Sequence, residues 1–162
     1  MSFTTDEIKG IVNCCLQKLR KQDKYLLDKK VNERTITHKL AEYLQDHFPE
    51  FNVDCEYNRF EHNRLDDLVK RLELPRNKVN WDDTEAKTVF PDIIVHKRGK
   101  PEYNLLVIEV KKKSKLNTGN LERNNFDKNK LRAFTEEPYN YKSGLFLRID
   151  LDGENDILEW FP

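Results

Sequence analysis

The chain has few of the residues on which several common kinds of site depend. Among its 162 residues are three cysteines, Cys14, Cys15 and Cys55. Because two are adjacent and the third is remote, they suit neither a disulfide framework nor a paired zinc-ligand spacing. We interpret all three as reduced thiols. The five glycines are never grouped, so the sequence lacks a glycine-rich phosphate-binding loop.

Long hydrophobic runs are also missing. No segment approaches the roughly 18 consecutive apolar residues of a membrane span. The opening residues, MSFTTDEIKG, lack the basic and apolar regions of a signal peptide. We therefore expect a cytoplasmic protein without membrane contact. The length predicts a single domain over 1–162, with one core.

Neither sign of charge is in excess. The chain has 29 Lys and Arg and 29 Asp and Glu, so its formal net charge is zero and does not indicate a polyanionic partner. Basic residues do cluster around one apolar segment: Lys97, Arg98, Lys100, Lys111, Lys112, Lys113, Lys115, Arg123, Lys128, Lys130 and Arg132. Taken singly, each is most simply a solvated surface charge.

Two helices are predicted in the first fifty residues. TTDE at Thr4–Glu7 matches a capping box, and helical apolar spacing continues to about Arg20, so residues 1–30 form a helix and a polar connector. A second helix covers VNERTITHKLAEYLQDHF, with an apolar stripe of Ile36, Leu40, Leu44 and Phe48. At about 100° per residue, Glu33 falls inside that stripe near the helix start. His38 lies about 140° away from Glu33 and is expected on the surface.

The rest of the chain predicts a sheet with one more helix. FNVDCEY alternates as a half-buried strand, and polar residues 58–88 form an insertion with a short helix around Leu65–Leu72. Two apolar strands follow, joined as a hairpin around Gly99 and Pro101; then come a helix in NNFDKNKLRAFTEE and strands in GLFLRIDL and ILEWF. The core order is helix, helix, strand, strand, strand, helix, strand. We therefore predict an α/β fold with a central mixed β-sheet flanked by helices.

Charged residues lie within the most apolar of these strands. In FPDIIVHKRGKPEYNLLVIEVKKK the strands contain Asp92, Glu109 and Lys111. Buried unpaired charges are so costly that such groups persist only where they are paired, bind a metal or perform chemistry. Strand alternation places Glu109 and Lys111 on one face of the strand and Lys112 on the opposite face. Pairing of the hairpin then brings Asp92 beside Glu109 and Lys111.

Two neighbouring carboxylates repel each other unless a cation and a lysine compensate them. Hard oxygen ligands of this kind suit Mg²⁺ or Mn²⁺, which bind phosphate oxygens at their open positions. The spacing of an acidic residue two before a lysine is weak by itself, since it recurs at Glu7, Asp28 and Glu85. Only at Glu109 does it end an apolar strand, with Pro-Asp at the start of the preceding strand and an inward glutamate on an earlier helix.

This combination resembles the PD-(D/E)xK nuclease superfamily, which includes restriction endonucleases, Holliday junction resolvases and Mrr-like enzymes. The residues that carry the resemblance are Pro91, Asp92, Glu109, Val110 and Lys111. It covers the chain from Val31 to about Leu151 and implies a restriction endonuclease-like core. The glutamate that many members carry on the first core helix matches Glu33.

The resemblance also implies roles for particular residues. The metal ligands would be two carboxylates and one carbonyl: Asp92, Glu109 and the backbone oxygen of Val110. Lys111 would orient or polarise the attacking water, and Glu33 would support a water on the metal or a second ion. Lys130 stands where some members place a phosphate-contacting residue. Lys113, one pleat beyond Lys111, is the second expected phosphate contact.

The sequence therefore predicts a metal-dependent nuclease that hydrolyses phosphodiester bonds, with DNA rather than RNA as the expected substrate, in restriction, phage defence or repair. Cutting both strands of a duplex needs two sites, which predicts a homodimer or a subunit of a larger assembly. The first helix and the 58–88 insertion are the candidate contact surfaces. The alternative is a catalytically inert, nuclease-like domain that binds nucleic acid or another protein.

Overall fold

The computed structural model describes residues 3–57, 72, 90–113 and 121–162. These residues form α1 (Thr5–Gln22), α2 (Lys24–Asp28), α3 (Glu33–His47), β1 (Asn52–Cys55), β2 (Ile93–His96), the 3-10 turn η3 (Pro101–Tyr103), β3 (Leu106–Lys113), α5 (Leu121–Thr135), β4 (Ser143–Asp150) and β5 (Ile157–Phe161). The predicted insertion lies outside the described residues apart from Leu72. None of the described helices is both long and apolar enough to cross a membrane.

Side-chain caps fix where the first and third helices begin. The amide of Glu7 donates to Thr4 Oγ1 at 3.2 Å and the amide of Thr4 donates to Glu7 Oε2 at 2.7 Å, so the predicted capping box of α1 is confirmed. Asn32 caps α3 by accepting from the Thr35 amide at 2.8 Å. Glu33 is therefore the first residue of α3. Within the predicted connector, the five-residue α2 is too short to show a periodicity in sequence.

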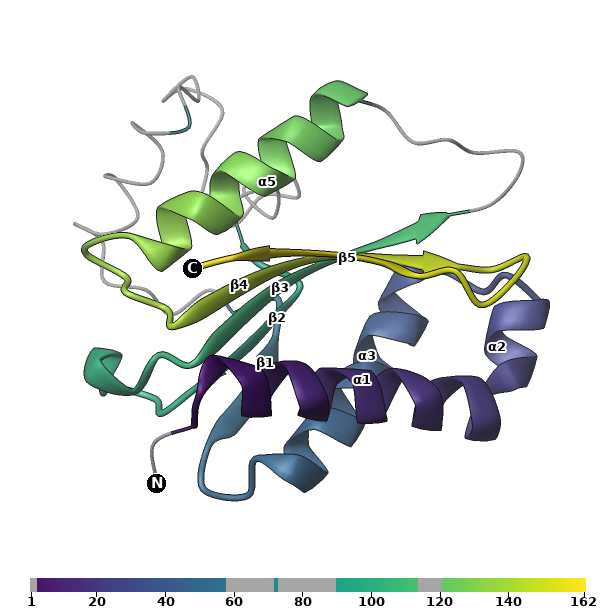
Figure 1. Ribbon diagram of the computed structural model, residues 1–162, viewed down its shortest axis with the longest axis horizontal. Coiled ribbons are helices and arrows are strands. Elements are labelled where there is room, and N and C mark those ends of the chain that lie inside the picture. The colour runs from purple at the N-terminus through teal and green to yellow at the C-terminus, as the bar shows by residue number, and fades with distance from the viewer. Residues whose placement is uncertain (1–2, 58–71, 73–89, 114–120) are drawn as a thin grey trace.

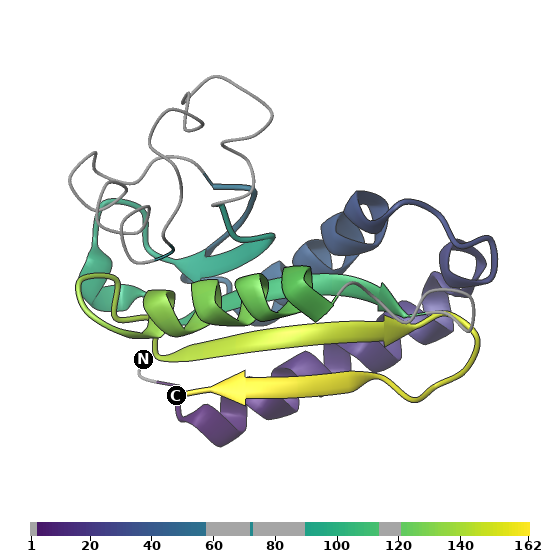
Figure 2. The same cartoon turned by 90° about the horizontal axis from the view of Figure 1, so that it is seen from above.

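The five strands form one mixed sheet in the order β1-β2-β3-β4-β5. β1, β2 and β3 pair antiparallel, β3 and β4 pair parallel, and β5 pairs antiparallel with β4. A parallel connection needs a crossover, and the segment containing α5 provides it. As Figures 1 and 2 show, α5 covers one face of the sheet, while α1 and α3 cover the other. The predicted α/β fold, hairpin and flanking helices are confirmed.

Strand alternation divides the buried residues into two clusters. From β3, Leu106, Ile108 and Val110 pack into the cluster beneath α1 and α3. Val107 packs on the opposite face, in the cluster with the α5 residues Leu131 and Phe134. Along β4 and just beyond it, alternate residues join the first cluster: Leu145, Leu147, Ile149 and Leu151. By the same alternation Glu109 and Lys111 face α5.

β3 is longer than its hairpin partner. β2 has four residues and β3 has eight, and their pairing covers only the first half of β3, from Val95 opposite Leu106 to Ile93 opposite Ile108. On the β2 side, residues 109–113 have no partner strand among the described residues. The four charged side chains at positions 109 and 111–113 all lie in this half of the strand.

One arginine joins α1 to the turn between β4 and β5. Arg20 donates from Nε to Asp156 Oδ2 at 3.1 Å, from Nη1 to the Gly153 carbonyl at 2.8 Å and from Nη2 to the Asp150 carbonyl at 3.1 Å. Asp156 also accepts from the Asp150 amide at 2.8 Å. The side chains of Arg20 and Asp156 are only 18% and 11% exposed, so the hydrogen bonds between them are partly buried and charge-assisted.

We expect Asp156→Asn to destabilise the protein by about 1–3 kcal/mol, because it removes a charged acceptor from a partly buried arginine. The matched control is Asp46→Asn, which breaks the exposed ion pair of Asp46 with Lys18 and should change stability little. Urea unfolding followed by circular dichroism compares the two variants. Equal midpoints for both variants would show that the Arg20 network contributes no more than a surface ion pair.

Candidate active site

Two carboxylates take the place of the strand that β3 lacks. The Val110 amide donates to Asp92 Oδ2 at 2.7 Å, and the Lys112 amide donates to Glu33 Oε2 at 3.1 Å. Asp92 directly precedes β2, and Glu33 begins α3. Because the amide and carbonyl of one strand residue point to the same side, the Val110 carbonyl is directed toward the side on which Asp92 lies. The predicted proximity of Asp92 to the end of β3 is confirmed.

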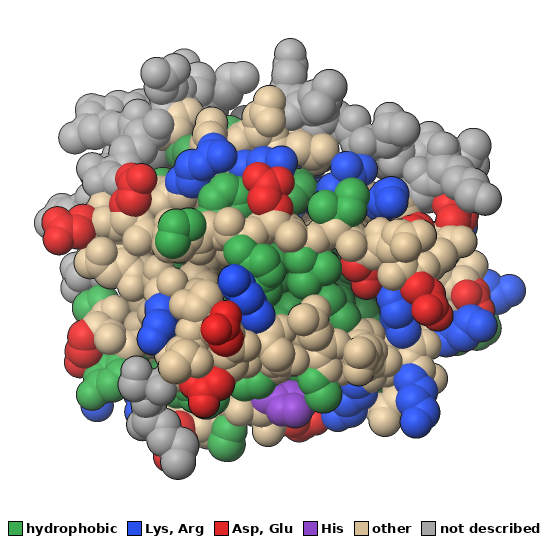
Figure 3. Space-filling model, in the orientation of Figure 1, with side chains coloured by type: hydrophobic (Ala, Val, Ile, Leu, Met, Phe, Trp, Pro, Cys, Tyr) green, Lys and Arg blue, Asp and Glu red, His purple; other side chains and the backbone are tan. Residues whose placement is uncertain are grey.

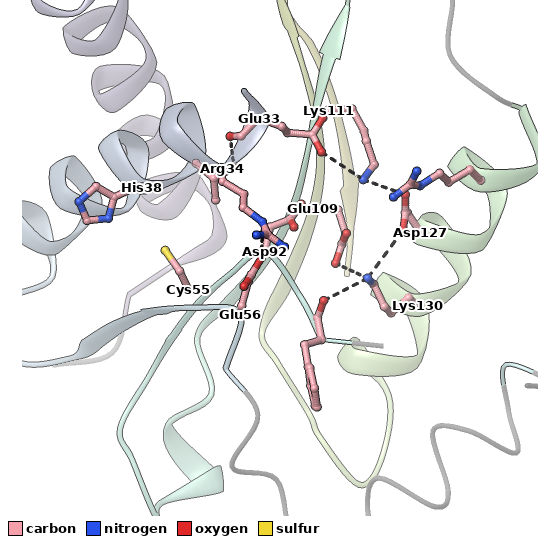
Figure 4. A pocket seen from close by; sticks show the side chains of 13 residues that line it. Glu33, Arg34, His38, Cys55, Glu56, Asp92, Glu109, Lys111, Asp127 and Lys130 are labelled. Atoms are coloured by element: carbon pink, nitrogen blue, oxygen red, sulfur yellow. Dashed lines mark hydrogen bonds and ion pairs between the residues drawn. The ribbon is translucent and has the colours of Figure 1, made fainter. Parts of the chain in front are cut away.

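On the α5 side, each charged residue of β3 meets an opposite charge. Lys130 Nζ lies 2.8 Å from Glu109 Oε1, and Lys111 Nζ lies 3.2 Å from Asp127 Oδ2. Asp127 and Lys130 are one helical turn apart on α5, with 3.7 Å between Oδ1 and Nζ. Lys111 Nζ also lies 3.8 Å from Glu33 Oε1. Figure 4 shows these side chains converging from α3, β3 and α5.

The convergence forms one wall of a pocket of about 380 Å³. Its lining includes all four residues predicted to be catalytic, together with nine others: Arg34, Thr37, His38, Cys55, Glu56, Phe90, Arg123, Asp127 and Lys130. Five acidic and four basic side chains are among these residues. The pocket is therefore strongly charged but nearly balanced in charge.

Burial makes two carboxylates of this pocket, Glu109 and Asp92, hard to ionise. Glu109 is 1% exposed, and burial raises its pKa to about 8, although the nearby Lys130 ammonium lowers it. Burial likewise raises the pKa of Asp92, against the lowering effect of Lys111 and of the Val110 amide. The charge of Asp92 adds to the raised pKa of Glu109, and the charge of Glu33 adds to the raised pKa of Asp92. A cation bound between Asp92 and Glu109 would relieve both effects.

Lys111 behaves in the opposite way. Burial alone would lower its pKa, but the carboxylates around it, with Asp127 and Glu109 first, raise the pKa above its ordinary value. The ammonium therefore carries its proton at neutral pH. This favours Lys111 as a charge that orients a water or stabilises an anion, and disfavours it as a proton acceptor.

Two buried acceptor atoms test whether the pocket suits a cation. Glu109 Oε1 and Asp127 Oδ2 have no hydrogen-bond partner among the described residues, because their contacts with the lysines are ion pairs without hydrogen-bond geometry. Within the described segments, no three Asp, Glu, His or Cys side chains lie close enough together to hold a metal ion. Mg²⁺ needs only one or two carboxylates when substrate oxygens and water complete its shell. Binding of such an ion by Asp92, Glu109 and the Val110 carbonyl needs only these two carboxylates, and it stays a prediction.

The structure corrects the surroundings of three predicted residues. Glu33 is not inside the apolar stripe: its side chain is 35% exposed, because it is the first residue of α3 and reaches sideways to the sheet edge. Lys130 is 2% exposed and pairs with Glu109 inside the pocket, so it is not a surface residue, and its contact with a phosphate stays a prediction. Lys112 does point away from Glu109, but its side chain has a structural contact, since its Nζ donates to the Val31 carbonyl at 2.9 Å.

The remaining predicted residues lie at the margin of the site. Lys113 is outside the pocket lining, with its Nζ 3.8 Å from Asp150 Oδ2 and a side chain 34% exposed. His38 is 68% exposed, as expected, and lies on the pocket wall. The three cysteines are free thiols, with Cys14 and Cys55 exposed and Cys15 buried.

Asp127 is the residue that sequence reasoning missed. It is 3% exposed and precedes Leu131 by four positions and Phe134 by seven, so it belongs to the buried stripe of α5. An acidic residue inside an apolar helical stripe was the signal that identified Glu33. The same test applied to α5 would have found Asp127.

The raised pKa of Glu109 predicts a pH dependence of stability. The folded state holds this proton up to about pH 8, whereas the unfolded chain releases it near 4.5, so the free energy of unfolding falls as pH rises between these values. We expect wild type to lose about 1–3 kcal/mol more than Glu109→Gln between pH 5.5 and 8. Urea unfolding of both proteins at several pH values measures the difference. Parallel curves would show that Glu109 ionises normally.

Comparison with known proteins does not identify a family. No family model, curated protein or solved structure matches the chain. The resemblance to PD-(D/E)xK nucleases and their core therefore stays a prediction from sequence. Function has to be inferred from the pocket itself.

Proposed function

We propose that the chain is a metal-dependent nuclease that hydrolyses phosphodiester bonds, with DNA as its substrate. The observation that carries the proposal is the convergence of Asp92, Glu109 and the charged Lys111 at the half of β3 that has no partner strand on the β2 side. Paired carboxylates hold Mg²⁺ or Mn²⁺ in such sites, and a fixed cationic group beside them suits a phosphate that gains negative charge during hydrolysis.

Each residue then has a distinct task. Asp92 and Glu109, with the Val110 carbonyl, would hold the ion, which on binding supplies positive charge to the phosphate oxygens. Lys130 Nζ lies 2.8 Å from Glu109 Oε1 and lowers the pKa of Glu109, which favours the ionised form that a ligand must have. Lys111 orients the attacking water and offsets charge on the phosphate.

The pocket favours water over a side chain as the nucleophile. Cys55 is the thiol on its wall. Although part of Cys55 reaches the surface, desolvation by the surrounding pocket, followed by the charge of Asp92, raises the pKa of this thiol to about 11. A thiol that keeps its proton is a poor nucleophile. Thr37 directs its hydroxyl to the Glu33 carbonyl at 2.9 Å. Direct hydrolysis therefore agrees better with the pocket than a covalent intermediate does.

Basic side chains at the rim suit a polyanionic substrate. Arg34 projects from α3 with 70% of its side chain exposed and pairs with Glu56 at 3.1 Å. Arg123 is exposed on α5 and also lines the pocket. α5 has further basic residues, among them Lys128 and Arg132. Figure 3 shows Lys and Arg side chains near the top of the molecule, where α5 lies in Figure 1. Phosphates flanking a scissile bond could contact such residues.

One observation favours the alternative of an inert, nuclease-like binding domain. Asp92 and Glu33 each accept a β3 amide, and Glu109 is paired with Lys130, so every predicted catalytic carboxylate also has a structural partner. A domain that uses these carboxylates only to complete its sheet would bind nucleic acid or a protein without cutting it. The alternative therefore predicts folding without catalysis.

Cleavage assays distinguish the two functions. We expect plasmid, linear or branched DNA to be cut with Mg²⁺ or Mn²⁺ and to stay intact in excess EDTA. Lys111→Met should slow single-turnover cleavage by about 100- to 10,000-fold. Lys100→Met is the matched control, because it removes the same charge from an exposed position at the turn end of the hairpin. Full activity in EDTA, or equal losses in both variants, would contradict the proposed mechanism.

Glu33→Gln separates the charge of Glu33 from its hydrogen bond. Glutamine keeps an oxygen that can accept from the Lys112 amide, but it loses the negative charge near Lys111. If Glu33 serves the chemistry, cleavage should slow by about 10- to 1000-fold while the thermal midpoint holds. Rate measurements on folded protein, with melting curves of the same samples, decide this. A lower midpoint with unchanged activity would assign Glu33 to the sheet edge alone.

A further inference from the structure

The face of α5 that lies on β3 carries a charge pattern complementary to the strand. Glu109 and Lys111 are two residues apart on β3, and Asp127 and Lys130 are three apart on α5. Both pairs point along one face of their element. The result is two crossed ion pairs, Glu109 with Lys130 at 2.8 Å and Lys111 with Asp127 at 3.2 Å.

Asp127 has no task in the hydrolysis described above, although it lines the pocket. It is 3% exposed, and its Oδ2 is a buried acceptor without a hydrogen bond among the described residues. A buried carboxylate is costly unless it is paired. Its Oδ2 lies 3.2 Å from Lys111 Nζ, whereas its Oδ1 lies 3.7 Å from Lys130 Nζ. Lys111 is therefore its nearer partner.

Lys111 needs a partner of this kind. A lysine ammonium sits on a flexible four-carbon stem, and its position is not set by the strand alone. Glu33 approaches it at 3.8 Å, but that carboxylate is 35% exposed and already accepts the Lys112 amide. Asp127 is closer and buried, and it is carried by a helix that packs against β3 and β4. It is the firmer of the two constraints.

We propose that Asp127 is a positioning residue, which fixes the Lys111 ammonium at the pocket wall beside Asp92 and Glu109. The proposal rests on the proposed function, and Asp127 itself contacts no reacting atom. The competing explanation is that Asp127 only fastens α5 to the sheet. The two explanations differ in whether its effect on rate passes through Lys111.

A double-mutant cycle measures that difference. We expect Asp127→Asn to lower kcat by about 10- to 100-fold, the scale of a displaced catalytic group, with KM unchanged and Mn²⁺ affinity not weakened, since Asp127 raises the pKa of Glu109. In a Lys111→Met background the same substitution should change kcat by less than about twofold, because its target is gone. An undiminished effect in that background, or an unchanged kcat in Asp127→Asn alone, would overturn the proposal.

Glu159→Gln is the matched control. It removes the carboxylate that pairs with Lys128, the residue next to Asp127 on α5, and it lies outside the pocket lining. Its kcat should equal that of wild type. If it lowers kcat as much as Asp127→Asn does, loss of any ion pair that fastens α5 is sufficient, and the positioning role is excluded.

A readout that needs no cleavage separates failure of this proposal from failure of the proposed function. In ¹⁵N-lysine spectra of wild type, the Lys111 ammonium should give a hydrogen-exchange-protected signal, identified by its loss in Lys111→Arg. The signal should persist in Glu159→Gln and vanish in Asp127→Asn. Its absence from folded wild type, or its survival in Asp127→Asn, would overturn the proposal whether or not the protein cuts DNA.

If Asp127→Asn does not fold, Asp127→Glu gives the decisive rate. It keeps the charge but moves it by one methylene, so kcat should fall below that of wild type while the fold persists. An Asp127→Glu kcat equal to that of wild type would show that the placement of this carboxylate does not matter, and would overturn the proposal.

Discussion

The half of β3 that β2 leaves unpaired is the feature on which the pocket depends. Two backbone amides there, of Val110 and Lys112, point where no described strand continues, and leaving such groups unsatisfied is costly. Asp92 and Glu33 accept them at 2.7 and 3.1 Å. The same bonds bring two carboxylates from distant parts of the chain to one edge of the sheet. The side chains that complete the sheet edge are therefore also the ones proposed to act in catalysis.

The second constraint is the charge that this arrangement buries. Glu109 and Lys111 face α5. Apolar residues on α5 would leave both of their charges without a partner, but α5 instead has Lys130 and Asp127 at these positions. Removing one member of such a pair leaves a buried charge without its partner. Burial raises the pKa of Glu109 to about 8, so binding of a divalent ion near neutral pH should release a proton.

What the sequence predicted and what it missed follow from the range of the interactions. The prediction that Asp92 lies beside Glu109 was confirmed. It depended only on a short hairpin and on strand alternation, both of which are local features of the sequence. The partners of Lys111 and Lys130 depend on how α5 docks on β3, which no local pattern states. Glu33 was placed in the apolar stripe because periodicity cannot show that the cap at Asn32 makes it the first helical residue.

The central claim is that this pocket binds a divalent cation through Asp92 and Glu109. Calorimetric titration of the folded protein with Mn²⁺ at pH 7, repeated in buffers of different ionisation enthalpy, tests it most directly. The account predicts saturable binding with proton release, weakened at least about tenfold by Asp92→Asn and by Glu109→Gln. Absence of binding, or equal affinity in wild type and both variants, would contradict it.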